Sequence, residues 1–188
     1  QIMEMDGVLP ADIMKSLSIE DNIDSVFKSG EGLGASGSFF FFSKDNRFLI
    51  KTCSAYEREI LINMLDPFIK HLKSVNNKSL IAKIYGVFTI KSNVFKQVDV
   101  MIMKNASAKK NRQNYSVKFD LKGSLFNREV TLPAHLSKNK LRQHGFKGVL
   151  KDVNFLKMQK EFEYMNFSEA ECLDYHTIIY NDTKFLNS

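Results

Sequence analysis

Apolar side chains recur along the chain with two different spacings, which predict a mixture of helices and strands. Helical spacing is clearest over residues 54–74, which we expect to form one helix. Ser54 is a candidate N-cap with Glu57 three residues later, as in a capping box. Pro67 lies inside the same segment and predicts a kink or a break. The apolar positions of this helix are Ile60, Leu61, Met64, Leu65, Phe68 and Leu72.

Short apolar runs on either side of this helix predict strands. Residues 35–52 predict a hairpin, because the apolar runs Phe39–Phe42 and Phe48–Ile50 flank a polar turn at 44–47. A hairpin, then a helix, then further strands is the order of an α+β fold with an antiparallel sheet and an inserted helix. The other predicted elements are strands over 80–90, 96–104 and 115–122, and one or two short helices over 10–28.

A glycine-rich stretch at the start of the hairpin carries candidate chemistry. Gly32, Gly34 and Gly37 have G-x-G-x-x-G spacing, and Lys51 ends the second apolar run. Glycine lets backbone N–H groups approach phosphate oxygens, and lysine adds a compact positive charge. A dinucleotide-binding motif has a helix after its glycines, whereas a strand pattern follows here, as in kinases. The alternative is a plain hairpin with a glycine-rich turn.

Glu57 has two candidate roles. It follows Lys51 by six residues, near the start of the predicted helix, where a kinase carries the glutamate that pairs with its strand lysine. It is also the acidic residue of the capping box with Ser54. The two roles compete for one carboxylate, and the neighbouring glycine and lysine signals favour the ion pair.

Composition narrows the classes of protein and partner. The 188 residues, 44% of them hydrophobic, suffice for one domain or slightly more. No apolar run reaches the roughly 18 residues of a membrane span, and we expect no secretion signal. Cys53 and Cys172 are expected to be free thiols in a reducing compartment, and the scattered histidines suggest no zinc site. The net charge of +6 favours anionic partners, but without an arginine-rich arm we expect no nucleic acid.

The sequence DLKGS at 120–124 is followed four residues later by Arg128. Taken in order with the glycine-rich stretch, Lys51 and Glu57, this highly specific motif resembles the phosphatidylinositol phosphate kinase family, and the phosphatidylinositol-4-phosphate 5-kinases in particular. The resemblance covers roughly residues 12–155, as a small lobe and the start of a large lobe. The matching segments are GASGSFFFFSKDNRFLIKT at 34–52, EREILINMLDPFIKHL at 57–72, YGVF at 85–88, IMKN at 102–105, FDLKGSLFNREV at 119–130 and LKDVNF at 150–155.

The resemblance implies ATP-dependent phosphorylation of the inositol ring of a phosphatidylinositol monophosphate, with roles for individual residues. The residues that would cover the ATP phosphates are Gly34, Ala35, Ser36, Gly37 and Ser38. Lys51 would bind those phosphates with Glu57 as its partner. The hinge that holds adenine would be Met103, Lys104 and Asn105. In the DLKGS stretch, Asp120 and Lys122 would face the nucleotide cleft, Lys122 and Arg128 would bind substrate, and Lys151 and Asp152 would be structural first.

Simpler interpretations exist for some of these residues. Asp120 and Lys122 could form an exposed charge pair worth under about 1 kcal/mol. Met103 could simply fill core space. Arg128 could brace its neighbours instead of binding a ligand.

The C-terminal stretch 173–180 reads LDYHTIIY and predicts a strand. The resemblance sets Asp174 and Tyr175 beside the family's catalytic aspartate segment, so Asp174 is a candidate catalytic residue. The family's magnesium-binding aspartate and lipid-selecting loop are not found up to Ser188, and Asp182 comes too early to hold the metal. We therefore assign no metal ligand, and expect Mg²⁺ only if the full-length protein is an active kinase.

Two functional alternatives follow from a large lobe that is truncated or absent. One is a lipid kinase seen in part. The other is a catalytically inactive kinase-like fragment in a larger assembly, with a protein partner covering the missing lobe. The expected division is a helical segment at 1–30, a small lobe at 31–130, and a basic connector with a large-lobe remnant at 131–188. Basic residues at 138–151 favour a phosphoinositide headgroup or anionic membrane surface, and hence a cytoplasmic protein peripheral to membranes.

Overall fold

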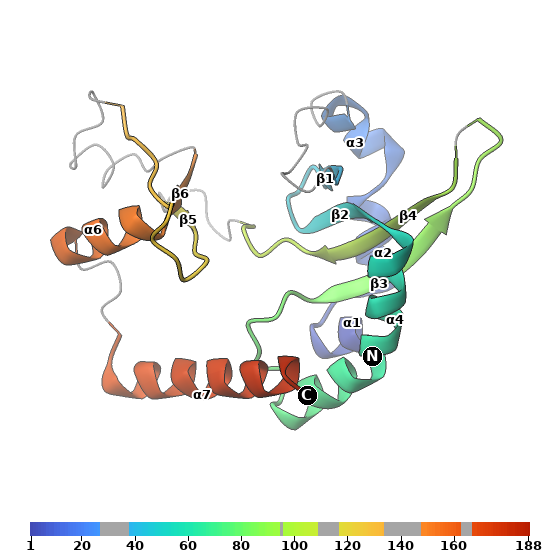
Figure 1. The fold of residues 1–188 in the computed structure, drawn as a ribbon. Helices are drawn as coiled ribbons and strands as arrows, with labels where there is room; N and C mark the ends of the chain where they lie inside the picture. The colour runs from blue at the N-terminus through green and yellow to red at the C-terminus, as the bar shows by residue number, and fades with distance from the viewer. Residues whose placement is uncertain (27–37, 95, 109–116, 134–147, 163–166) are drawn as a thin grey trace. The chain divides into compact units, whose positions relative to one another are not determined.

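A four-stranded antiparallel sheet in the order β1-β2-β4-β3 is the centre of the N-terminal part of the chain (Figure 1). The computed structural model describes residues 1–26, 38–94, 96–108, 117–133, 148–162 and 167–188. The chain divides into two compact units, Gln1–Ala108 with Leu173–Ser188, and Lys109–Cys172. This boundary differs from the expected division at residue 130, because the DLKGS stretch pairs within the second unit.

The strands of the first unit confirm the predicted hairpin and the two strands that follow. Their bounds are β1 Phe40–Phe42, β2 Phe48–Cys53, β3 Ile84–Ile90 and β4 Val98–Lys104. In the β1–β2 turn, Asn46 has a φ of 59°, a left-handed conformation that asparagine tolerates. β2 lies between β1 and β4, with Lys51 opposite Phe40 on one side and Met101 on the other. Lys51 is therefore held on both sides by the backbone ladder.

Helix α4, Ala55–Ser74, is inserted between β2 and β3 as predicted. Ser54 caps it, and the helix runs through Pro67 without a break. Figure 1 shows that its axis changes direction along its length, which agrees with the predicted kink. Its buried residues Phe68 and Leu72 form a core cluster with Ile2, and Phe185 packs against them.

Short helices precede the sheet. Two of them, α2 Pro10–Ser16 and α3 Ile19–Val26, confirm the expected helical segment, while α1 Ile2–Met5 was not predicted. They fasten the hairpin turn through side chains. Ser16 donates to the Asp45 carboxylate at 2.5 Å, and Asn22 accepts from the N–H of Lys44 at 2.8 Å.

The second unit contains a two-stranded parallel sheet. Strand β5, Lys118–Asp120, pairs with β6, Val149–Lys151, and helix α6, Asp152–Phe162, follows at once. Leu150 and Met158 are the buried residues of its core cluster. The predicted strand at 115–122 therefore exists in shorter form.

Helix α7, Glu169–Leu186, occupies the stretch in which a strand was expected at 173–180, so that prediction was wrong. Ser168 and Glu171 cap the N-terminus of this helix through two reciprocal hydrogen bonds. The Ser168 N–H donates to the Glu171 carboxylate at 2.9 Å, and the Glu171 N–H donates to the Ser168 hydroxyl. This is a capping box, and reading it in the sequence would have predicted the helix. Among the described helices, none combines the length and apolarity that a membrane crossing requires.

Candidate functional site

Lys51 and Glu57 meet across the junction between β2 and α4. The Lys51 amine donates to one oxygen of the Glu57 carboxylate, Oε1, at 2.9 Å. The Lys51 side chain is 20% exposed, so its amine is sheltered yet still reachable. Placing the lysine on a strand and the glutamate on the following helix reproduces the ion pair that the sequence predicted.

Glu57 performs both of the roles that had seemed to compete. While Oε1 accepts from Lys51, Oε2 accepts from the Ser54 N–H at 2.8 Å and from the Ser54 hydroxyl at 3.1 Å. These bonds, led by the Ser54 N–H and followed by Lys51, lower the pKa of Glu57 to about 2. The carboxylate is therefore charged throughout the physiological pH range, and the helix cap fixes the orientation in which it meets Lys51.

A second ion pair joins the start of α4 to the sheet. Arg58 donates to Asp99 of β4 at 3.2 Å, and Thr89 of β3 donates to the same carboxylate oxygen at 2.6 Å. This link was not predicted from the sequence, because nothing local to Arg58 indicates a partner 41 residues away.

In the second unit, Arg128 and Asp152 form a tightly bonded pair. Arg128 Nε donates to Asp152 Oδ2 at 2.7 Å, and both side chains are about one-tenth exposed. The other oxygen of Asp152 accepts from the N–H groups of Lys122 and Gly123, each at 2.9 Å. Arg128, then the backbone donors, lower the pKa of Asp152. Arg128 therefore braces the DLKGS turn, one of the two roles considered for it.

The sequence of the chain is also similar to proteins of one known family. Residues 23–188 match the model of the family described as phosphatidylinositol-4-phosphate 5-kinase. The chain belongs to this family.

Individual relatives support the assignment. Phosphatidylinositol 4-phosphate 5-kinase 5 from Arabidopsis thaliana is 31% identical over 171 residues, covering 87% of this chain and 20% of that protein. A probable phosphatidylinositol phosphate kinase from Dictyostelium discoideum is 34% identical over 133 residues, covering 67% and 17%. The human type-1 beta phosphatidylinositol 4-phosphate 5-kinase is 28% identical over 163 residues, covering 87% and 27%. The chain thus spans about a fifth of the length of the first two relatives.

The family's expected glycine loop falls mainly outside the described residues. Gly34, Ala35, Ser36 and Gly37 are not described, and Ser38 is half-buried at the start of the described hairpin. Immediately after it, the Phe39 N–H donates to the Thr52 hydroxyl at 2.9 Å, and the Thr52 N–H donates to the Phe39 carbonyl at 3.0 Å. The chain leaving the loop is thereby fastened beside Lys51.

The expected kinase hinge has structural bonds of its own. Met103 lies within β4 between Leu49 and Ile84. The Lys104 N–H donates to the Lys83 carbonyl at 2.9 Å, and the Asn105 N–H donates to the Arg47 carbonyl at 3.0 Å. These two N–H groups already have partners, so adenine would have to use other backbone groups of the segment. The hinge role stays a prediction.

The side chains of the hinge residues are also engaged. The Lys104 amine donates to the Asp6 carboxylate at 2.8 Å. Asn105 is buried and donates to the Asn46 carbonyl at 2.8 Å, which ties the end of β4 to the hairpin turn.

Among the other predicted ligand residues, Lys122 and Asp174 are exposed, while Asp120 is half-buried. The Asp120 carboxylate accepts from Lys122 at 3.2 Å, the simpler interpretation considered for this pair, and also from Arg128 at 3.2 Å. Asp174 lies on α7, where its carboxylate accepts from Lys78 at 3.0 Å with both side chains more than half exposed. These contacts lend no support to a catalytic role for Asp174, and they leave the Lys122 side chain accessible.

Proposed function

We propose that this chain forms the nucleotide-binding part of a phosphatidylinositol phosphate kinase, which transfers phosphate from ATP to the inositol ring of a phosphatidylinositol monophosphate. The observation that carries the proposal is the Lys51–Glu57 ion pair, formed at 2.9 Å between a strand lysine and a capped helix glutamate. In kinases this pair must be in place for phosphoryl transfer. The family assignment supports the substrate class.

The mechanism assigned to this chain is positional and electrostatic. Lys51 provides a fixed positive charge for the phosphate oxygens of ATP. Glu57 keeps the amine in place, and its own orientation is set by the bonds to Ser54. Because the lysine is already oriented before nucleotide arrives, binding does not require the side chain to lose further rotamer freedom.

The described residues do not offer a magnesium site. No group of three or more His, Cys, Asp or Glu side chains among them is placed to hold a metal ion. The mechanism of this chain therefore assigns no role to Mg²⁺. The residues present do fit the phosphates of ATP, because the Lys51 amine is sheltered, partly accessible and held in a fixed orientation.

Substrate binding in this proposal falls to Lys122. Arg128 is occupied by Asp152 and Asp120, whereas the Lys122 side chain is 61% exposed and its amine contacts Asp120 at the surface. An exposed lysine of this kind can exchange one carboxylate for a phosphate of the lipid headgroup. The protein would then act at the cytoplasmic surface of an anionic membrane.

The decisive experiment is phosphate transfer from radiolabelled ATP to vesicles containing phosphatidylinositol monophosphate, using the full-length protein. Lys51→Ala should abolish measurable transfer and weaken nucleotide binding about tenfold to a hundredfold, the range for a lost charge-assisted bond. Lys70→Ala, an exposed lysine on α4, is the matched control and should leave both unchanged. Equal transfer by the wild type and Lys51→Ala would refute the proposal.

The competing function, an inactive kinase-like subunit, has its own outcome in the same experiment. It predicts no transfer from the wild-type protein, whether or not nucleotide binds. If transfer is absent, a thermal melting experiment with ATP shows whether the inactive subunit still binds nucleotide. A ligand present at a hundred times its dissociation constant stabilises the fold by about 2.7 kcal/mol.

A further inference from the structure

Helix α7 is anchored to α4 through a buried hydrogen bond between Asp182 and His71. Along the described helix α7, Asp182 is the buried residue. It accepts a hydrogen bond from Nε2 of His71 at 2.7 Å, and its other oxygen accepts from the Leu80 N–H at 2.7 Å. The side chains of Asp182 and His71 are both less than 10% exposed. A buried carboxylate with this many donors is oriented far more strictly than a surface one.

Aromatic stacking extends this anchor. The Phe185 ring lies 4.7 Å from the His71 ring, nearly parallel to it, and 5.8 Å from the Phe68 ring. Although burial raises the pKa of Asp182, the bonds from His71 and Leu80 outweigh it, so that this pKa lies below its usual value. The carboxylate is therefore charged, and the anchor is complete at neutral pH.

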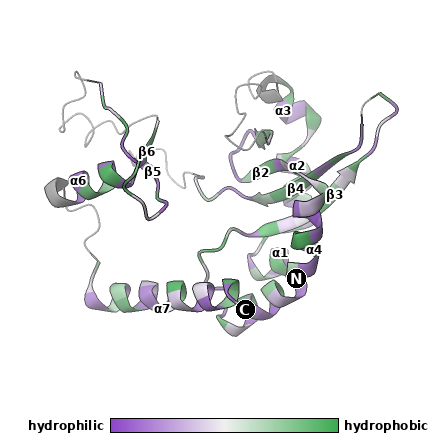
Figure 2. Ribbon diagram, in the orientation of Figure 1, coloured by the Kyte–Doolittle hydropathy of each residue, from purple (hydrophilic) through white to green (hydrophobic). Residues whose placement is uncertain are grey.

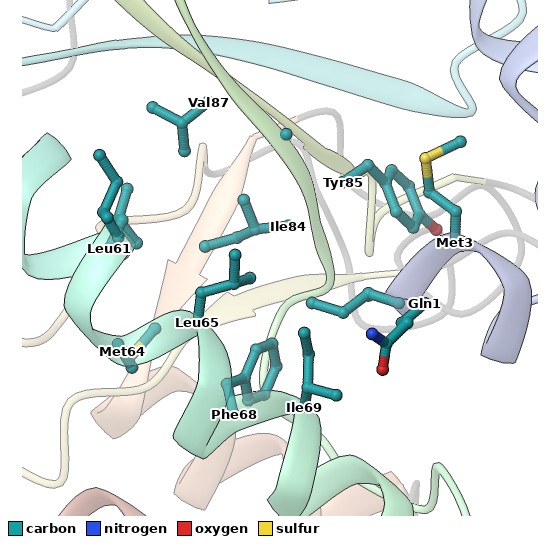
Figure 3. Close-up of a pocket in the computed structure, with 13 residues that line it drawn as sticks. Gln1, Met3, Leu61, Met64, Leu65, Phe68, Ile69, Ile84, Tyr85 and Val87 are labelled. Carbon is teal, nitrogen blue, oxygen red and sulfur yellow. The ribbon is translucent and has the colours of Figure 1, made fainter.

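The N-terminal half of α4 is much less tightly packed than this C-terminal half. Tyr56 and Ile62 are 73% and 58% exposed. A cavity of about 300 Å³ lies beneath the middle of the helix, lined by α4 residues between Leu61 and Ile69. In Figure 3, side chains of α4, including Leu61 and Leu65, line one side of it, and Ile84 and Val87 of β3 line another. The buried residues of α4 all lie in its C-terminal half, so the N-terminal half is held less firmly against the sheet.

The other restraints on the N-terminal half are polar and partly exposed. They are the Lys51–Glu57 pair and the Arg58–Asp99 pair, in which the Glu57 and Arg58 side chains are 41% and 34% exposed. The opposite members, Lys51 and Asp99, are 20% and 8% exposed, so each pair joins a sheltered side chain to a partly exposed one, and solvent screening at the exposed end limits what the pair contributes. The buried contacts at Phe68, His71 and Leu72 are therefore the firm attachment of the helix.

We propose that Asp182 and Phe185 of α7 are positioning residues for nucleotide binding: by fixing the C-terminal half of α4, they hold Glu57 where it pairs with Lys51. Asp182 is the buried residue of α7 and the Phe185 ring stacks on His71 and Phe68, while hydrophobic and hydrophilic residues are interspersed along the helix (Figure 2). The predicted effect on nucleotide affinity rests on the proposed function. The predicted effect on the geometry of the Lys51–Glu57 pair is independent of that function.

The test uses the full-length protein with Asp182→Asn and Phe185→Leu, which keep most of the packing volume. Asp66→Asn is the matched control, because it removes an exposed carboxylate from α4 itself. The first measurement is the rate at which an amine-acylating reagent modifies Lys51, read by mass spectrometry. We expect a rise of about twofold to fivefold in both α7 variants, the range for losing a partly exposed ion pair, and no rise in the control.

The second measurement separates positioning from general destabilisation. Amide hydrogen exchange should accelerate at residues 55–62 more than at the β4 amides in the α7 variants, whereas loss of global stability would accelerate both equally. Unchanged Lys51 modification, or equal acceleration in α4 and β4, would overturn the proposal.

The third measurement is nucleotide affinity in a double-mutant cycle. Asp182→Asn should weaken ATP binding severalfold in the wild-type background and have no further effect when Glu57→Gln is already present. Additive losses would overturn the positioning role. If wild-type protein binds no ATP, the proposed function fails, while Lys51 modification and hydrogen exchange still decide whether α7 positions Glu57.

Discussion

The double role of Glu57 can be taken apart by three substitutions. Ser54→Ala removes the cap hydroxyl but leaves the Lys51–Glu57 contact. Glu57→Gln retains an acceptor for the Ser54 N–H but removes the charge that faces Lys51, and Glu57→Ala removes both. The structure makes this separation possible, because Oε1 serves the lysine and Oε2 serves the cap.

The expected magnitudes differ between stability and binding. Loss of an N-cap side chain costs about 0.5–2 kcal/mol, so Ser54→Ala should lower the free energy of unfolding by about 1 kcal/mol. With Glu57 41% exposed, the ion pair adds no more than about 1 kcal/mol to stability, and Glu57→Gln should change it less than Ser54→Ala does. Nucleotide affinity should show the reverse order, since the charge on Glu57 holds Lys51 in place.

Denaturant unfolding and calorimetric titration with ATP measure the two quantities on the same preparations. Glu57→Ala should show both losses together. Our reasoning fails if Ser54→Ala weakens ATP binding as much as Glu57→Gln does, because the cap would then be inseparable from the lysine contact. It also fails if Glu57→Gln leaves ATP affinity at the wild-type value.

Three further predictions concern pH, the core and the second unit. The Glu57 pKa is lowered from 4.5 to about 2, so the charged carboxylate contributes fully to the free energy of unfolding above pH 4.5, and this contribution is lost as pH falls toward 2. The difference in unfolding midpoint between the wild type and Glu57→Gln should therefore shrink between pH 4.5 and pH 2. Leu72→Ala, at a fully buried site, should cost about 3 kcal/mol in denaturant unfolding, whereas Leu65→Ala, 44% exposed on the same helix, should cost less than half as much; equal costs would contradict the core assignment. Arg128→Ala should lower the unfolding midpoint more than Lys122→Ala does, because it strands a buried carboxylate; the opposite order by calorimetry would mean that Arg128 is not a brace.

The DLKGS stretch shows where a motif and a structure give different kinds of information. The motif indicated the family correctly, and the match over residues 23–188 confirms it. It did not indicate that Arg128 would be bonded to Asp152, because these residues are 24 positions apart and meet only when β5 pairs with β6. A resemblance to a family identifies the residue types at each position, whereas the contacts of each residue depend on how the chain folds.

Local sequence was sufficient for the β1–β2 hairpin, the capped start of α4 and the Lys51–Glu57 pair. Each of these depends on residues within a few positions of one another, where periodicity and capping act directly on the backbone. Where the sequence analysis failed locally, at 173–180, the reason was a short apolar run that fits strand and helix alike, and an overlooked cap at Ser168.

Tertiary structure alone decided the partners of Asp182 and His71, which are 111 residues apart in the chain. A single aspartate or histidine carries no periodic signal, so its burial and its partner emerge only when α4 and α7 pack together. The same holds for the parallel pairing of β5 with β6. The sequence determined which elements form and which chemistry Lys51 carries, because both depend on residues close in the chain. Packing determined what holds Glu57, the partner of Lys51, in place, because burial is a property of the folded chain.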